Sequence, residues 1–206
     1  MKTKYFLFLL LAGSIVYPQS ANQSINKLQS KFKSITNFTA NFSQNYYNAQ
    51  GHEQEKGSGT LTYQRKNKFV VVLKYQLIVS DGETVWNNDK RFNRVVISNL
   101  SDDPTTFSLE RFIFDYPPLC KIKLVKDDPA YKGEEYVELT PKDQDMEFKY
   151  VRIWMAPDGM ISKLEVLDLG DIRYSFQFSD IKTNQDLPDS RFIFYPPKGI
   201  KIIDLR

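Results

Sequence analysis

The sequence contains almost no histidine or cysteine. His52 and Cys120 are the single residues of these two types among 206. One cysteine cannot form an intramolecular disulfide, and one residue of each type cannot build the His/Cys clusters that bind zinc. We therefore predict that Cys120 is a small buried apolar residue and that His52 lies in a solvated polar turn.

Catalytic motifs are also missing. The chain has no glycine-rich phosphate loop and no nucleophile with a histidine partner in a recognisable motif. These absences predict a protein that is not an enzyme and has no catalytic residue, no metal site and no cofactor. Acidic side chains are plentiful, so a carboxylate acid/base pair stays open as an alternative that the sequence cannot place.

The net charge is low as well, because 28 Lys and Arg stand against 25 Asp and Glu. Two of the basic residues, Lys2 and Lys4, precede the apolar run Tyr5–Ala12, which is too short to span a bilayer. This pattern predicts a cleaved secretory signal peptide at residues 1–20, with cleavage near Ser20–Ala21; a retained membrane anchor is the alternative.

Removal of Lys2 and Lys4 leaves 26 basic and 25 acidic residues, a charge of about +1. So balanced a chain predicts no nucleic-acid partner and no polybasic patch for a membrane. No cysteine follows the predicted cleavage site closely, so the exported protein is expected to carry no lipid anchor.

Residues 21–206 have the length of one domain and are rich in Phe and Tyr. The first element is predicted to be a helix, because Ile25, Leu28, Phe32 and Ile35 form one apolar stripe. Asn22 or Ser24 is expected to cap its start.

From Asn37 the apolar period changes to two, which is typical of half-buried strands. A second, short helix is expected to start at Asp102-Asp103-Pro104, to bury Leu109, Phe112, Ile113 and Tyr116, and to end at Pro117-Pro118. Besides the strand at Asn37, the predicted strands are Gly59–Tyr63, Lys68–Tyr75, Leu77–Val79, Thr84–Trp86, Phe92–Ser98, Cys120–Val125, Tyr136–Leu139, Phe148–Met155, Met160–Leu167, Ile172–Asp180, Phe192–Phe194 and Ile200–Ile202.

Strands in mostly consecutive order favour a single antiparallel meander, and two helices with apolar faces must be buried against it. We predict a mainly β fold with helices. It is an unclosed antiparallel β-barrel, or strongly curved sheet, with a helical lid over its concave face. The space inside is either a solid core, which the composition alone favours, or a hydrophobic cavity for an apolar ligand.

Five segments also occur in a recognisable order. They are Asn37-Phe-Thr-Ala-Asn-Phe-Ser-Gln44, Gly57-Ser-Gly-Thr-Leu61, Ile78-Val-Ser-Asp-Gly-Glu-Thr-Val-Trp86, Leu139-Thr-Pro141 and Phe194-Tyr-Pro-Pro-Lys-Gly-Ile200. Behind an export signal, this series resembles the periplasmic outer-membrane lipoprotein carrier family, LolA, over essentially the whole of residues 21–206.

The resemblance implies an unclosed antiparallel barrel with a lid of short helices, which agrees with the fold predicted from the residues. It implies a monomeric periplasmic carrier that accepts acylated lipoproteins from an inner-membrane ATP-driven releasing complex. The carrier would deliver them to an outer-membrane acceptor or to the outer membrane itself. The alternatives are a periplasmic binding module for a glycolipid or other amphiphile, and the lipid-anchored acceptor of the same pathway. The lack of a cysteine after the signal disfavours the acceptor.

The resemblance also implies roles for individual residues. Arg65 matches a family arginine that bonds to the lid and holds it shut when empty. Here Lys66 follows it, where the family usually has proline, and Lys66 could share the role. Phe32 and Phe69 match apolar positions of the family's first helix and cavity. From strand parity and helix stripe we add to the predicted acyl-chain cavity Leu28, Phe42, Val71, Trp86, Phe107, Leu109, Phe112 and Ile113.

Overall fold

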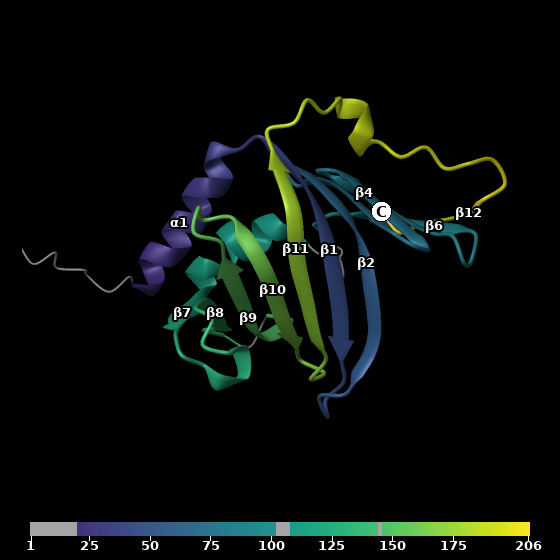
Figure 1. Ribbon diagram of the computed structural model, residues 1–206. Coiled ribbons are helices and arrows are strands. Elements are labelled where there is room, and N and C mark those ends of the chain that lie inside the picture. The colour runs from purple at the N-terminus through teal and green to yellow at the C-terminus, as the bar shows by residue number, and fades with distance from the viewer. Residues whose placement is uncertain (1–19, 102–107, 144–145) are drawn as a thin grey trace, which may run out of the picture.

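The structure, a computed structural model, describes residues 20–101, 108–143 and 146–206 (Figure 1). The predicted signal peptide up to residue 19, the helix start at residues 102–104 and the cavity residue Phe107 lie outside this part of the chain. Among the described residues, no helix combines the length and the apolar character needed to cross a bilayer.

The first described element is helix α1 (Ala21–Ser34), as the apolar stripe predicts. Its cap is Ser20 rather than Asn22 or Ser24, because the helix begins at Ala21 and the cap lies one residue before it. The Ser20 hydroxyl accepts from the Gln23 backbone N at 3.2 Å, and the Gln23 side-chain oxygen accepts from the Ser20 backbone N at 2.8 Å. This reciprocal pair is a capping box.

The described residues form a single twelve-stranded sheet that bends strongly around α1 (Figure 1). Its strand order is β12-β6-β5-β4-β3-β2-β1-β11-β10-β9-β8-β7, so β12 and β7 are the two edges and the sheet does not close. The strands are β1 (Asn37–Tyr47), β2 (Glu53–Gln64), β3 (Lys68–Leu73), β4 (Gln76–Asp81), β5 (Thr84–Asp89), β6 (Arg94–Asn99), β7 (Cys120–Val125), β8 (Tyr136–Pro141), β9 (Phe148–Met155), β10 (Ile161–Asp168), β11 (Arg173–Thr183) and β12 (Lys201–Asp204).

Two predictions about the chain end are wrong. The expected strand at Phe192–Phe194 is replaced by the short 3₁₀ helix η4 (Asp189–Phe192), which follows Pro188. The last strand, β12, pairs with β6 in parallel, so the sheet is not purely antiparallel. The segment before β12 crosses the outer face of the sheet, and this crossover returns the chain in the direction of β6.

Short helical turns complete the described fold. The π-helical turn η1 (Arg111–Asp115) and the 3₁₀ turn η2 (Pro117–Leu119) follow one another where the second helix was predicted. We call residues 108–119 the lid segment. The 3₁₀ turn η3 (Pro129–Tyr131) lies between β7 and β8, and η4 lies between β11 and β12.

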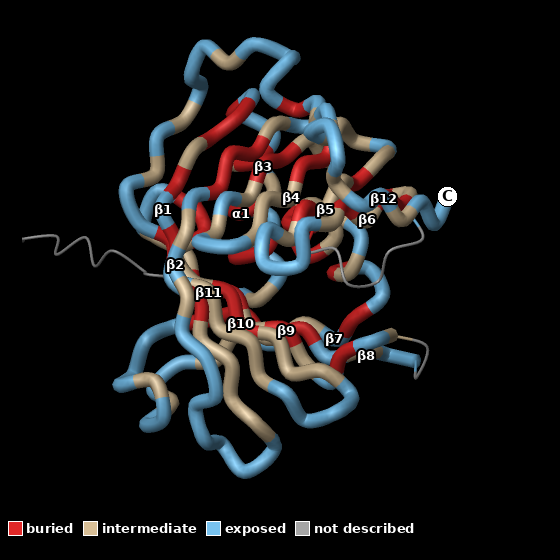
Figure 2. The backbone as a smooth tube through the Cα atoms, turned by 90° about the vertical axis from the view of Figure 1, so that its right-hand side faces the viewer, coloured by how far each residue is buried: buried red, intermediate tan, exposed pale blue. Residues whose placement is uncertain are grey.

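Buried side chains form two clusters on opposite faces of the sheet. The main cluster lies on the concave side and joins side chains of α1, the lid segment and the inner face of the sheet. Figure 2 shows the buried stretches of the strands in red and the exposed turns in pale blue. Cys120 belongs to it and is 3% exposed, as predicted for a small apolar residue. The second cluster is small and joins Val70 and Val79 on the outer face to Phe192 of the C-terminal segment.

Candidate functional site

The concave face has an aromatic centre close to the C-terminal half of α1. The ring centroids of Phe32 and Phe38 are 5.8 Å apart, and those of Phe38 and Tyr63 are 5.1 Å apart. Phe32 comes from the helix, whereas the other two come from neighbouring strands that pair in register. The helix is thus attached to the sheet through ring contacts.

The lid segment lies against the same interior. Leu109, Phe112 and Ile113 are buried in the main cluster, as the predicted helix stripe requires. Tyr116 bridges the segment to the sheet, with ring centroids 5.3 Å from Phe112 and 5.1 Å from Phe148. Apolar contacts therefore provide most of the attachment of this segment, and such contacts can be exchanged for a different apolar ligand.

One carboxylate, that of Glu110, makes two polar contacts between the lid segment and the β2–β3 hairpin. The Tyr63 hydroxyl donates to Glu110 Oε1 at 2.5 Å, and the Asn67 backbone N donates to the same oxygen at 3.2 Å. The Ser108 hydroxyl donates to the Asn67 side-chain oxygen at 2.6 Å. Burial, followed by the bond to Glu110, raises the pKa of Tyr63, so its hydroxyl stays a donor. We call the contacts of Glu110 with Tyr63 and Asn67 the Glu110 latch.

Sequence reasoning missed the Glu110 latch. Glu110 stands next to Arg111 on the polar side of the predicted lid helix and therefore looks like a solvated position. Its partners are more than forty residues away along the chain, at separations of 47 and 43. No local pattern in the sequence signals such a contact.

Arg65 lies on the same β2–β3 turn but contacts α1. Its Nη1 donates to the Lys33 carbonyl at 3.4 Å, and its backbone N donates to the Thr36 carbonyl at 3.1 Å. Arg65 therefore supports the end of the helix rather than the lid segment. Besides Glu110, the lid segment is held by Arg111, whose Nη2 donates to the Leu100 carbonyl at 2.9 Å, and by Gln29, whose Nε2 donates to the Ile113 carbonyl at 2.9 Å. Lys66 is exposed and has a positive φ of 69°. The lid-closing roles of Arg65 and Lys66 stay predictions.

The predicted cavity residues are largely brought together. The main cluster contains Leu28, Phe32, Phe42, Phe69, Val71, Leu109, Phe112 and Ile113. Trp86 is placed elsewhere, because its register partners are Val79 and Ile97 and it packs on the outer face against the second cluster. Its neighbour Val85 takes the inward position, as alternation along a strand requires.

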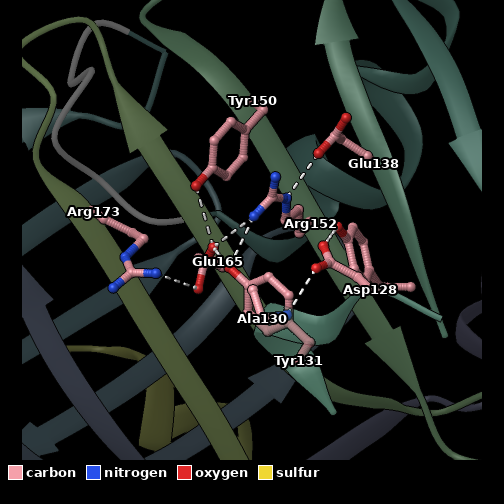
Figure 3. Close-up of polar contacts among 9 residues, drawn as sticks. Asp128, Ala130, Tyr131, Glu138, Tyr150, Arg152, Glu165 and Arg173 are labelled. Atoms are coloured by element: carbon pink, nitrogen blue, oxygen red, sulfur yellow. Dashed lines mark hydrogen bonds and ion pairs between the residues drawn. The ribbon is translucent and has the colours of Figure 1, made fainter. Parts of the chain in front are cut away.

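A cluster of charged and phenolic side chains lies on the outer face of β8–β11 (Figure 3). Glu165 is only 2% exposed and accepts from the Tyr131 hydroxyl at 2.5 Å. Arg152 Nη1 is 3.5 Å from Glu165 Oε1, and Arg152 Nε donates to Glu138 at 2.7 Å. Arg173 Nη1 is 3.8 Å from Glu165 Oε2.

This cluster holds a loop rather than forming a reaction site. Tyr131 belongs to η3, and the nearby Asp128 accepts from the Tyr136 hydroxyl at 2.6 Å. The hydrogen bond from Tyr136 holds the pKa of Asp128 below its usual value. The two carboxylates that converge on Arg152 lie on the face opposite the apolar interior, so they form no acid/base pair inside it.

An open groove of about 620 Å³ lies on the outer side of β1, β2 and β11. Its wall side chains are mostly amides and hydroxyls, and none of them is ionisable at neutral pH. The lining residues are Asn41, Phe42, Ser43, Ser58, Gly59, Thr60, Gln177 and Ser179. Such a surface lacks the apolar area that an acyl chain needs.

Comparison with known proteins places this architecture in a family. The family model described as outer membrane lipoprotein carrier protein LolA matches residues 33–195. The chain belongs to the LolA family. A LolA-family relative from Legionella pneumophila (strain Paris), named outer-membrane lipoprotein carrier protein, is 30% identical over 204 residues, covering 97% of this chain and 98% of its own. A relative of the same name from Nitrosospira multiformis is 28% identical over 202 residues, covering 96% and 95%.

One solved structure supports the fold. An uncharacterised conserved protein from Thermus thermophilus superposes with a TM-score of 0.55 at 16% identity, covering 89% of this chain and 99% of that protein. A LolA superfamily protein from Nitrosomonas europaea gives a TM-score of 0.46 at 14% identity, covering 85% and 98%. The predicted recognition of the LolA family and the predicted open, mainly β fold are confirmed.

Proposed function

We propose that the protein binds the acyl chains of lipoproteins between the concave face of its sheet and the cover formed by α1 and the lid segment. It would carry them through the periplasm from the inner to the outer membrane. The observation that carries the proposal is the apolar interior that α1, the lid segment and the sheet enclose together. The names of the family and of its relatives support the same cargo.

The energetics of acyl chains explain why an apolar interior is needed. Burial is worth about 0.8 kcal/mol per methylene, so a chain of roughly 15 carbons gains on the order of 10 kcal/mol in an apolar environment. A lipoprotein in water forfeits most of this gain. An interior lined by aromatic and aliphatic side chains restores it without making or breaking a bond, so the proposed role needs no catalytic group.

Release of cargo requires that the empty protein has favourable internal contacts, which cargo binding must break. Because the lid segment and α1 already fill the interior, cargo must displace apolar contacts and separate the lid segment from the sheet. The Glu110 latch stabilises the closed, empty state and therefore lowers the affinity for cargo by the same free energy. We propose that this lower affinity allows the cargo to be transferred to an acceptor.

We propose the following partners and state for the carrier. An inner-membrane ATP-driven lipoprotein-releasing complex loads it, and an outer-membrane acceptor or the outer membrane itself receives the cargo. The protein acts as a monomer in the periplasm, after the signal peptide has been removed and without a lipid anchor of its own. The apolar interior that α1, the lid segment and the sheet enclose supports this non-enzymatic role.

Substitution of Glu110 by alanine tests the latch. A hydrogen bond to a charged group contributes about 1.5–3 kcal/mol, so the closed state of Glu110→Ala loses at least that much. We expect cargo to bind at least about tenfold more tightly and hand-over to acceptor membranes to slow by a similar factor. The measurements are equilibrium binding of a solubilised acylated lipoprotein and the rate of its transfer to outer-membrane vesicles.

Two matched variants separate the latch from general effects on the turn. Tyr63→Phe removes one donor to Glu110 but keeps the ring that packs on Phe38, so its effect should be smaller and in the same direction. Arg65→Leu should leave loading intact and impair hand-over about twofold, because its bond to α1 is long and exposed. Unchanged binding and transfer in Glu110→Ala, with thermal stability near that of the wild type, would remove the latch from the mechanism.

A further inference from the structure

Two neighbouring hairpin turns expose aromatic rings at one end of the sheet. Tyr75 in the β3–β4 turn is 47% exposed, and Phe92 in the β5–β6 turn is 64% exposed. The Lys90 backbone N donates to the Tyr75 carbonyl at 2.9 Å, which fixes the two turns side by side. The Arg91 guanidinium carbon is 5.8 Å from the centroid of each ring. Single exposed apolar residues are ordinary, but two rings joined in this way form a shared surface.

Basic side chains surround the two rings. Lys74 Nζ is 4.9 Å from the Tyr75 ring, and the Arg94 guanidinium carbon is 5.0 Å from the Phe92 ring. Lys201 at the start of β12 adds a further cation, because its backbone N donates to the Asn93 carbonyl at 3.1 Å. We define the hairpin-tip surface as Lys74, Tyr75, Lys90, Arg91, Phe92 and Arg94.

The net charge of the whole chain does not reveal how basic the hairpin-tip surface is. With Lys201 it has five basic residues against one carboxylate, Asp89, which lies 3.7 Å from Arg91 Nε. The whole chain has an excess of only three basic residues. The fold therefore brings basic residues from three separate segments together into one patch. The balanced composition had predicted that no such patch exists.

We infer that the hairpin-tip surface docks on an anionic phospholipid bilayer. Tyr rings settle at the headgroup level of membranes, and Phe rings enter the boundary between headgroups and acyl chains. Each Lys or Arg near an anionic surface increases binding about fivefold. The rings stand on protruding turns, so a deformable surface such as a bilayer can receive them, whereas a rigid macromolecule would need a matching groove. Charge complementarity and exposed rings thus favour the same occupant.

The position of the surface relates it to the apolar interior. Leu73, two residues before Tyr75, is partly buried against the main cluster. β6, which follows the β5–β6 turn, and its neighbour β12 lie on the opposite side of the molecule from α1 in Figure 1. Docking through the two turns would bring that rim of the sheet to the headgroups while leaving α1 away from the membrane. The hairpin-tip surface lies outside the proposed cargo site, so docking on a membrane does not depend on the proposed function.

Vesicle flotation of the mature, cargo-free protein tests the inference. We expect binding to phosphatidylcholine vesicles that contain phosphatidylglycerol, weakening as the ionic strength rises, and little binding to pure phosphatidylcholine. Lys74→Glu/Arg91→Glu should lower the affinity at least about 25-fold, because two contributions of about fivefold are lost. Tyr75→Ala/Phe92→Ala should lower it about tenfold, since the rings no longer enter the interface.

Matched variants control for charge and hydrophobicity elsewhere. Lys121→Glu/Lys182→Glu makes the same charge change at exposed positions on β7 and β11, and Tyr195→Ala removes a ring that is 78% exposed. Both should bind like the wild type. Absence of flotation with anionic vesicles at low ionic strength, equal losses in the control variants, or tighter binding to a single-stranded oligonucleotide than to the vesicles would overturn the inference. Cargo loading by Tyr75→Ala/Phe92→Ala, measured in parallel, shows separately whether the carrier function holds.

Discussion

Phe69→Glu should abolish cargo loading. Phe69 is buried on the concave face, where its register partner on β2 is Tyr63, and it belongs to the main cluster. A carboxylate at this position is desolvated without a partner, at a cost of several kcal/mol in an apolar site. We therefore expect the affinity for a solubilised acylated lipoprotein to fall at least about a hundredfold. The measurement is recovery of the complex by gel filtration after dilution of the detergent.

Two further variants keep this result interpretable. Phe69→Leu retains an apolar side chain of similar size and should load nearly as well as the wild type. If Phe69→Glu does not fold, Phe176→Glu replaces it, because Phe176 lies on the same face beside Phe42 and is only partly buried. Normal loading by a folded variant of either kind would show that cargo does not occupy the concave side.

The second large effect concerns stability and comes from the outer polar cluster. In Arg152→Leu the buried carboxylate of Glu165 loses its closer guanidinium, which lies 3.5 Å away. Removal of one partner of a buried ion pair is strongly destabilising, and we expect the free energy of unfolding to fall by about 3 kcal/mol. This is the low end of the usual range, because Arg173 and the phenols of Tyr131 and Tyr150 stay near Glu165. Denaturant unfolding measures the change.

The partner Glu138 supplies the control. It is about one-fifth exposed, so in Glu138→Gln the charge of Arg152 stays compensated by Glu165 and by solvent. We expect Glu138→Gln to cost about 1 kcal/mol, because glutamine keeps an oxygen that can accept from Arg152 Nε. Similar losses in the two variants would mean that the buried carboxylate does not depend on Arg152. Neither variant should change cargo affinity, because the cluster lies on the face opposite the interior.

Much of the fold follows from local sequence pattern. The predicted strands Cys120–Val125 and Phe148–Met155 coincide with β7 and β9, because alternation of apolar and polar residues marks both strands and their ends. The stripe of α1 and the buried face of the lid segment follow from helical periodicity in the same way. These features depend on residues within one or two turns of each other.

Features that depend on distant segments were not predicted. Alternation says which residues of β5 share a face but not which face is inward. Trp86 was therefore assigned to the cavity, whereas the C-terminal segment creates a second apolar layer for it outside. The parallel pairing of β12 with β6 and the Glu110 latch likewise join residues far apart in the sequence. The gathering of Lys74, Arg91 and Lys201 at one end of the sheet has the same origin.

Native mass spectrometry of the protein expressed in the periplasm tests whether its interior holds lipoprotein acyl chains, with bound lipids and polypeptides identified after extraction. The proposed function predicts a complex with one acylated lipoprotein, retained in the gas phase and lost in Phe69→Glu. A free glycolipid or fatty acid as the only ligand, with no lipoprotein bound even after challenge with solubilised lipoprotein, would contradict it. That result would identify the apolar interior as a binding site for small amphiphiles.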